Sequence, residues 1–295
     1  MELSSFVKRH YLIDTKIAAS VRLIHSYAKE SALPVAFVHY KHKRPSGEFQ
    51  KYQRKNDYTT IFIFAREGIH FVCGDTLYTP AFGDALLFGE DVPFASTYNA
   101  ADQSDYYEID LPRGFADLLY HENPFSSLLS NANRSPLISL PAGQKRELMS
   151  LLQEMEKTEG DLLLYAKLIL LSDMLEKGKG AAAETKKIPR VLARGMEYMH
   201  ERYTEIGGAE EVARYLGVST TYLSRLFGRV LGCTTTDYLN RLRLSRAKDL
   251  LLAGESVTEA CYAAGFGSYT YFITKFKEET GITPAKFRAK NAPLR

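Results

Sequence analysis

The chain has 295 residues, enough for two ordinary domains, and 45% of them are hydrophobic, which excludes an extended disordered chain. The 38 Lys and Arg residues nearly balance 35 Asp and Glu residues, so bulk charge alone indicates no nucleic-acid partner. Three widely spaced cysteines, at positions 73, 233 and 261, form no pair typical of a zinc site or a disulfide framework. Without a signal-peptide pattern or a membrane-spanning stretch, we expect a cytoplasmic protein with no membrane partner.

The first third of the chain has the pattern of a β-rich domain. Segments rich in β-branched and aromatic residues alternate with Gly and Asp turns, as in strands joined by hairpins. Strands are predicted at 58–65, 69–73, 76–79, 85–88 and 106–111, and Pro112 ends the last of them. This succession of short strands indicates a sheet sandwich or a small barrel.

Two helices are predicted after the strands. Residues 144–155 place their leucines on one stripe, and a second helix begins near Asp161, which can cap it. The resulting hairpin, 144–176, holds more leucine than a small β-domain needs to cover itself. That surplus favours a homodimer contact over the alternative of an ordinary domain core. The following segment, 178–187, is small, polar and unpatterned, and it is predicted to be an interdomain linker.

Dividing the chain at this segment changes the meaning of its net charge. Residues 188–295 hold 16 Lys and Arg against 11 Asp and Glu, a net charge of +5. Residues 1–187 hold the remaining 22 and 24, a net charge of −2. The whole-chain value of +3 is therefore the sum of a mildly acidic β-rich part and a basic part whose pattern is helical throughout.

The basic part contains an internal repeat, at about 209–228 and 257–278. In each copy a short helix is followed by a glycine, an apolar residue and a serine that can cap a second helix. Gly217 and Gly265 match at an offset of 48, whereas the helices that follow them match at 49. One extra residue therefore lies in or just after the second turn. This arrangement is what a helix-turn-helix unit requires.

The second helix of each copy separates into an apolar face and a polar face. Leucine and phenylalanine recur at the spacing of a buried stripe. The polar candidates for contacts with DNA bases are Thr221, Ser224 and Arg225 in the first copy and Tyr269, Thr270 and Thr274 in the second. Such side chains can reach base edges in a major groove, where Arg225 can bind guanine through two hydrogen bonds. A solvated helix face is the alternative for either copy alone; two copies on a basic background favour double-stranded DNA.

Between the copies, residues 235–253 are predicted to form one amphipathic helix. At 1.5 Å per residue it spans about 27 Å. A helix of this length can place two recognition helices about one turn of duplex apart, roughly 34 Å, on one face of the DNA. Basic side chains in this part are candidates for phosphate contacts, which supply affinity without sequence choice. They are Arg229, Arg241, Arg243, Lys275 and Lys277.

From about Ile188 to Arg288 the chain resembles the AraC/XylS family of bacterial transcription regulators. The most specific matches are Gly265-Phe266, Tyr271-Phe272, Phe276-Lys277, Thr280-Gly281 with Pro284, and Phe287-Arg288. The first copy matches through residues 223–227 and 241–247. The resemblance implies two helix-turn-helix units flanking a linker helix, with Thr221, Ser224 and Arg225 facing bases. Tyr269 and Thr274 stand where the family often has Gln and Arg, so we expect the second helix to depend more on DNA shape and phosphates.

The pattern around Gly74-Asp75 and Gly83-Asp84 resembles the cupin-type effector domain common in that family. Cupins can also be metalloenzymes, but the second-motif His position falls on Phe94, and no His-x-His precedes it. We therefore expect no metal, no cofactor and no enzymatic activity. Aromatic and polar residues are expected to line the barrel around a small molecule, with ordinary core aromatics as the alternative. The candidates are Phe37, Tyr40, Phe62, Phe64, His70, Tyr78 and Tyr107.

Together these patterns predict an α+β protein of two domains. Residues 1–177 are expected to form a cupin-like β-barrel with a helical hairpin, which binds an effector and dimerises, and residues 188–295 an all-α double helix-turn-helix domain. The predicted function is a ligand-responsive, sequence-specific transcription regulator that contacts RNA polymerase. By resemblance, a sugar is the expected effector and activation of carbohydrate or related catabolic genes the expected outcome. The alternatives are a constitutive regulator with a structural barrel and a cupin metalloenzyme fused to a DNA-binding domain.

Overall fold

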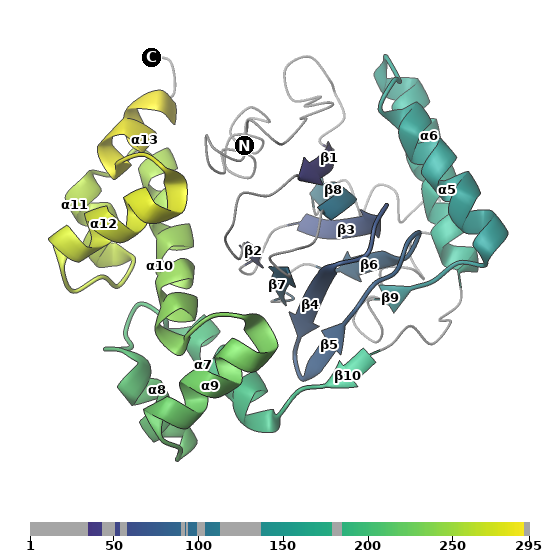
Figure 1. Ribbon diagram of the computed structural model, residues 1–295. Coiled ribbons are helices and arrows are strands. Elements are labelled where there is room, and N and C mark those ends of the chain that lie inside the picture. The colour runs from purple at the N-terminus through teal and green to yellow at the C-terminus, as the bar shows by residue number, and fades with distance from the viewer. Residues whose placement is uncertain are drawn as a thin grey trace. The chain divides into compact units, whose positions relative to one another are not determined.

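The computed structural model describes residues 35–42, 51–53, 58–89, 92, 94–98, 104–112, 137–178 and 185–291 (Figure 1). Its internal contacts divide the chain into two compact units. Among the described residues, the first unit ends at Lys186 and the second begins at Lys187. Within these ranges no helix is both long and apolar enough to cross a membrane.

The first unit is built on two five-stranded sheets. One contains, in spatial order, β1 (Ala36–His42), β8 (Ser104–Pro112), β3 (Tyr58–Phe64), β6 (Ala85–Phe88) and β9 (Leu137–Ile138). The other contains β10 (Thr185–Lys187), β5 (Thr76–Tyr78), β4 (Ile69–Cys73), β7 (Phe94–Tyr98) and β2 (Lys51–Gln53). In the described part of the chain each sheet is open, because its two outer strands pair on one side only. The strands predicted from the sequence are present, but the described strands form no closed barrel of the kind expected.

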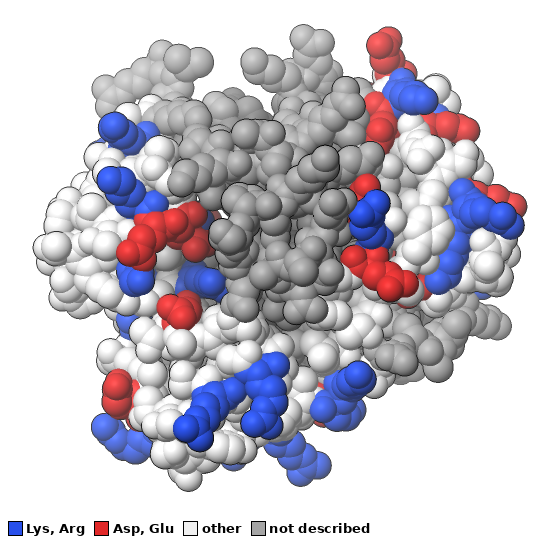
Figure 2. Space-filling model, viewed as in Figure 1, with Lys and Arg blue, Asp and Glu red and all other residues white. Residues whose placement is uncertain are grey.

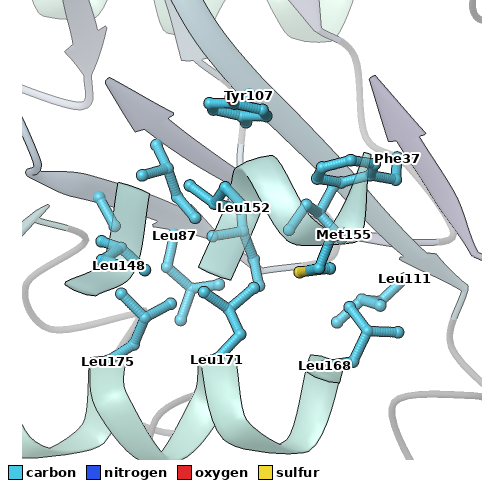
Figure 3. Packing of buried hydrophobic residues seen from close by; sticks show 14 of the residues in the cluster. Phe37, Leu87, Tyr107, Leu111, Leu148, Leu152, Met155, Leu168, Leu171 and Leu175 are labelled. Carbon is cyan, nitrogen blue, oxygen red and sulfur yellow. The ribbon is translucent and has the colours of Figure 1, made fainter. Parts of the chain in front are cut away.

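The strand register sorts the side chains of the first sheet onto two faces. Ile61 pairs with Ile109 and Phe62 with Glu108, and alternate residues of a strand point to opposite sides. The isoleucine face packs against helices α5 (Ala142–Met155) and α6 (Asp161–Lys177), whose leucines complete one hydrophobic core (Figure 3). The Phe62 face meets the second sheet, since the ring centroids of Phe62 and Phe71 are 4.9 Å apart.

One local expectation for this unit needs correction, and one segment has structure that the sequence did not predict. Asp161 does not cap α6: the N-cap is Gly160, whose φ of 92° suits a residue without a side chain, and Asp161 occupies the first helical position. The predicted linker 178–187 contains strand β10, which extends the second sheet at its edge. All three side chains of β10 are exposed, so no alternation of apolar and polar residues marked it as a strand.

The second unit is helical. It contains α7 (Arg190–Arg202), α8 (Ala209–Leu216), α9 (Thr220–Leu231), α10 (Thr235–Leu252), α11 (Val257–Ala263), α12 (Tyr269–Thr280) and α13 (Pro284–Asn291). Helix α10 runs between the group α7–α9 and the group α11–α13 (Figure 1). The pairs α8–α9 and α11–α12 coincide with the two repeats found in the sequence, and each is a short helix, a turn and a second helix.

The turns of the two pairs have the predicted chemistry. Gly217 and Gly265 have φ of 69° and 90°, the left-handed region that glycine enters without strain. Ser219 and Ser268 are the N-caps of α9 and α12. Because both second helices start directly after these serines, the extra residue of the second copy lies inside its turn, as Gly267.

The two turn glycines differ in the space around them. A Cβ atom at Gly217 would meet no atom within 4 Å. At Gly265 it would lie 2.6 Å from the Cα of Thr204 and 2.8 Å from the carbonyl oxygen of Thr204, in the loop between α7 and α8. The second turn therefore touches the backbone that precedes the first helix-turn-helix unit.

This contrast gives a matched pair of substitutions. Gly217→Ala should lower the free energy of unfolding by about 1–2 kcal/mol, the cost of a left-handed backbone for alanine. Gly265→Ala should cost about 1–3 kcal/mol more, because its methyl group overlaps backbone atoms that cannot rotate away. Chemical denaturation followed by circular dichroism measures both. Equal losses for the two variants would show that the close approach at Gly265 carries no energetic weight.

Candidate nucleic-acid interface

Helix α9 is held by one apolar face and presents the opposite face to solvent. The Ser219 hydroxyl accepts a hydrogen bond from the Tyr222 amide at 3.2 Å, which satisfies a donor at the start of the helix. Leu223, Leu226 and Phe227 are buried. Of the predicted base-reading residues, Thr221 and Arg225 are exposed and Ser224 is half-buried. The structure thus brings these three side chains together on the free side of α9.

Helix α12 is arranged in the same way. The Ser268 hydroxyl accepts from the Tyr271 amide at 3.3 Å, and Phe272 is fully buried. All three predicted base-reading residues of the second helix-turn-helix unit are exposed, namely Tyr269, Thr270 and Thr274. The Thr274 hydroxyl donates to the Thr270 carbonyl oxygen at 3.1 Å, so its proton is engaged within the helix. Helix α12 contains no arginine, so its exposed face lacks a guanidinium group comparable to that of Arg225 on α9.

Exposed tyrosines on α9, α11 and α12 were missed by the sequence analysis. Tyr222 on α9, Tyr262 on α11 and Tyr271 on α12 are all substantially exposed. Their positions off the apolar stripe of each helix were the available signal, since a large aromatic residue there has no core to enter. Tyr222 and Tyr271 lie on the same helices as the predicted readers, where each adds an aromatic ring to the surface.

The side chains predicted to contact phosphates differ in their exposure and in their partners. Arg229 and Lys277 are exposed, and Arg241 is half-buried. Lys275 lies 2.8 Å from a carboxylate oxygen of Glu278, and this hydrogen bond raises the pKa of Lys275. Lys and Arg side chains gather over α7 and α9 in Figure 2, so this part of the helical unit presents a positively charged surface.

Arg243 must be removed from the predicted phosphate contacts. Only 7% of it is exposed, and its Nε donates to the carbonyl oxygen of Tyr203 at 2.8 Å. Burial lowers the pKa of its guanidinium group. The signal was in the sequence: Leu239, Arg243 and Ala247 are spaced four apart, so they share the buried face of α10.

Part of this chain is similar to known proteins. A family described as "Helix-turn-helix domain" matches residues 212–290. An uncharacterised HTH-type transcriptional regulator of Pseudoalteromonas carrageenovora is 34% identical over 38% of this chain and 68% of its own length. A solved AraC-type regulator of Chromobacterium violaceum is 32% identical, with a TM-score of 0.32, over 36% of this chain and 95% of that chain. The chain belongs to the AraC family.

Another relative carries a functional name. The HTH-type transcriptional activator RhaS of Salmonella schwarzengrund is 32% identical over 43% of this chain. This match spans 44% of the length of RhaS. As a member of the AraC family, the protein is a DNA-binding transcription regulator.

In this AraC-family protein the predicted effector-binding residues do not form one wall. Phe37 and Tyr107 belong to the core under α5 and α6, where their rings stack at 5.7 Å. Phe62 and Phe64 point to the opposite side, between the sheets. Tyr78, in β5, lies on the same side of the sheet as Phe71, its register partner in β4. His70 precedes Phe71 in β4, so it points to the opposite side, and it is half-buried. The side chain of Tyr40, in β1, lies outside the described residues.

The space between the sheets also holds polar groups that the sequence analysis missed. Glu108 and Asp110 are buried on the same face of β8 as Tyr106. Asp110 accepts a hydrogen bond of 2.6 Å from the Thr60 hydroxyl. The signal was the alternation of acidic and apolar residues along this strand, which aims both carboxylates to one side. Phe94, at the expected metal-ligand position, is buried and stacks on Phe88 at 4.1 Å.

Proposed function

We propose that this regulator binds double-stranded DNA through both α9 and α12, with direct base contacts concentrated on α9. The observation that carries this proposal is the pairing of two capped helices, each held by a buried apolar face and each presenting polar side chains outward. Helix α9 offers Arg225 for bidentate contact with guanine, and Thr221 and Ser224 for neighbouring bases. Helix α12 offers Tyr269, Thr270 and Thr274, which suit contacts with apolar base groups and recognition of DNA shape.

Substitution of Arg225 tests this assignment. Arg225→Ala should lose about 1–3 kcal/mol of discrimination at a single base position, because one bidentate contact disappears. The measurement is binding to a selected operator and to its single-base variants. As a control, Lys277→Ala should weaken all sequences alike and lower the salt dependence by about one counterion. An unchanged ranking of bases in Arg225→Ala would contradict base reading by α9.

We further propose that the first unit binds a small hydroxylated molecule, with a sugar as the leading candidate, and that binding alters transcription. The support is the combination of buried carboxylates, Glu108 and Asp110, with aromatic rings such as Phe62 on one face of the sheet. Carboxylates accept hydrogen bonds from hydroxyl groups, and aromatic rings cover apolar ring faces. The name of RhaS, a transcriptional activator, supports activation as the outcome. In this proposal the activated complex includes RNA polymerase as a partner.

A thermal-shift screen of purified protein against sugars and related metabolites tests ligand binding. A true effector should stabilise the protein by about 2.7 kcal/mol at one hundred times its dissociation constant, since it binds only the folded state. Glu108→Gln should weaken that stabilisation, because an amide replaces one carboxylate acceptor. Stabilisation by none of the compounds would favour the alternative, a constitutive regulator whose β unit is structural. Stabilisation by a metal ion alone would favour the metalloenzyme alternative.

We also propose that the protein is a homodimer and that α6 supplies the contact. The leucines of α5 are largely used in the core, whereas α6 leaves Leu162, Leu163 and Leu170 exposed by 84%, 52% and 55%. Leu163 and Leu170 are seven residues apart, so they lie on one face of the helix. This outer stripe narrows the predicted dimer contact, 144–176, to one side of α6.

Sedimentation velocity tests this contact. A double variant, Leu163→Glu with Leu170→Glu, should weaken dimerisation at least tenfold, because two buried charges would face each other across the interface. Gln153→Glu, an exposed change on α5, is the matched control and should leave the dimer intact. A wild-type protein that sediments as a monomer at micromolar concentration, or a double variant that remains dimeric, would contradict the proposal.

A further inference from the structure

The guanidinium group of Arg243 lies where three parts of the second unit meet. Arg243 belongs to α10, the helix between the two helix-turn-helix units. Its Nε donates to the carbonyl oxygen of Tyr203 at 2.8 Å, and its Nη2 donates to the carbonyl oxygen of Ile206. Both acceptors are in the loop between α7 and α8. One planar group therefore links α10 to the backbone that enters the first helix-turn-helix unit.

The same guanidinium group also contacts the second helix-turn-helix unit. Its central carbon lies 6.0 Å from the centre of the Phe266 ring, a distance at which a cation is attracted to an aromatic face. Phe266 is the apolar turn residue between α11 and α12 and is buried. The adjacent Gly265 approaches the Tyr203–Thr204 backbone too closely to admit a side chain. The loop before the first helix-turn-helix unit, the Arg243 side chain and the turn of the second helix-turn-helix unit therefore form one junction.

A second polar contact secures α12 to the same helix. Asn240, three residues before Arg243 on α10, is buried and donates from Nδ2 to the Tyr271 hydroxyl oxygen at 2.7 Å. Tyr271 lies in the first turn of α12, next to the residues proposed to read DNA. Residues three apart lie on one side of a helix. One side of α10 thus contacts both the loop that precedes the first helix-turn-helix unit and the recognition helix α12 of the second.

We propose that Arg243 is a positioning residue that sets the spacing and rotation between the two recognition helices, so that both units read DNA as one rigid body. A rigid connection places the second helix at its half of the operator without a further loss of freedom, whereas a loose one lowers its effective concentration there. Arginine suits this role because its planar group donates to two carbonyl oxygens at once, which the single ammonium of lysine does not reproduce. The inference rests on the proposed binding of DNA by both helices.

The test uses the full chain and a series of operators. An operator is first selected with the wild-type protein, and variants of it contain zero, one, two or five additional base pairs between the two sub-sites. Each base pair shifts the second sub-site by about 3.4 Å and about 34° around the duplex. For the wild type we expect affinity to fall at least tenfold with one or two added base pairs, to the value for the first sub-site alone.

Arg243→Lys should bind the original operator at least fivefold more weakly, with a flattened dependence on spacing and unchanged affinity for the isolated first sub-site. Arg246→Lys, the same change three residues along α10, should behave as the wild type. Tyr271→Phe removes only the hydroxyl bound by Asn240 and should flatten the profile partly; thermal denaturation shows that each variant is folded. This second variant preserves the test if Arg243→Lys does not fold.

The outcomes separate the two levels of the proposal. A sharp spacing profile with wild-type affinity in Arg243→Lys, or in Tyr271→Phe if the first does not fold, would overturn the positioning role. Equal losses on the isolated sub-site and on the full operator would also overturn it, because they would show a general structural role. A wild-type protein that enriches no DNA sequence would instead overturn the proposed function, and this inference with it.

Discussion

The second unit depends on the burial of one face of each recognition helix. Phe227 in α9, together with Phe272 and Phe276 in α12, is completely buried. Burial of such side chains is the main favourable term in folding, and once these rings are inside, the rotation of each helix about its axis is determined. The polar side chains are outside for the same reason. The surface proposed to meet DNA is therefore a consequence of the core beneath it.

In the first unit an equivalent constraint acts through strands instead of helices. Alternate side chains of β3 and β8 face opposite sides, so the first sheet is buried on both. One side is covered by α5 and α6, and the other meets the second sheet. An aromatic residue in this sheet has a core to enter on either face, which is why Phe37 and Phe62 lie in different environments despite similar sequence surroundings.

His39 illustrates how the helical hairpin is joined to the sheet. It is buried on β1, lies 2.7 Å from a carboxylate oxygen of Asp105 on β8, and contacts the Glu156 carboxylate at the end of α5. Its ring stacks on Tyr107 at 4.0 Å. A buried polar group of this kind is tolerated because it has partners, and those partners come from separate elements. The hairpin that carries the exposed leucine stripe is thereby tied to a strand of the sheet.

The features predicted correctly from the sequence are those whose causes are local. The helix caps at Ser219 and Ser268, the left-handed glycines and the apolar stripes of α9 and α12 each depend on residues within one or two turns. The predicted strands in 58–88 were likewise recognisable from composition and turn residues. Patterning could not show whether the sheets close, because closure depends on which outer strands pair, and pairing is a contact between distant segments.

By itself, the amino-acid sequence determined the two kinds of secondary structure, the duplicated helix-turn-helix and the basic character of the carboxyl-terminal part. The tertiary structure alone decided the fate of Arg243, which the charge pattern assigned to phosphates and the fold assigns to two backbone carbonyls. It also decided which aromatic residues share a face with Glu108 and Asp110. The physical reason is common to both: a side chain's role follows from its partners, and these partners lie about 40 residues away or on another strand.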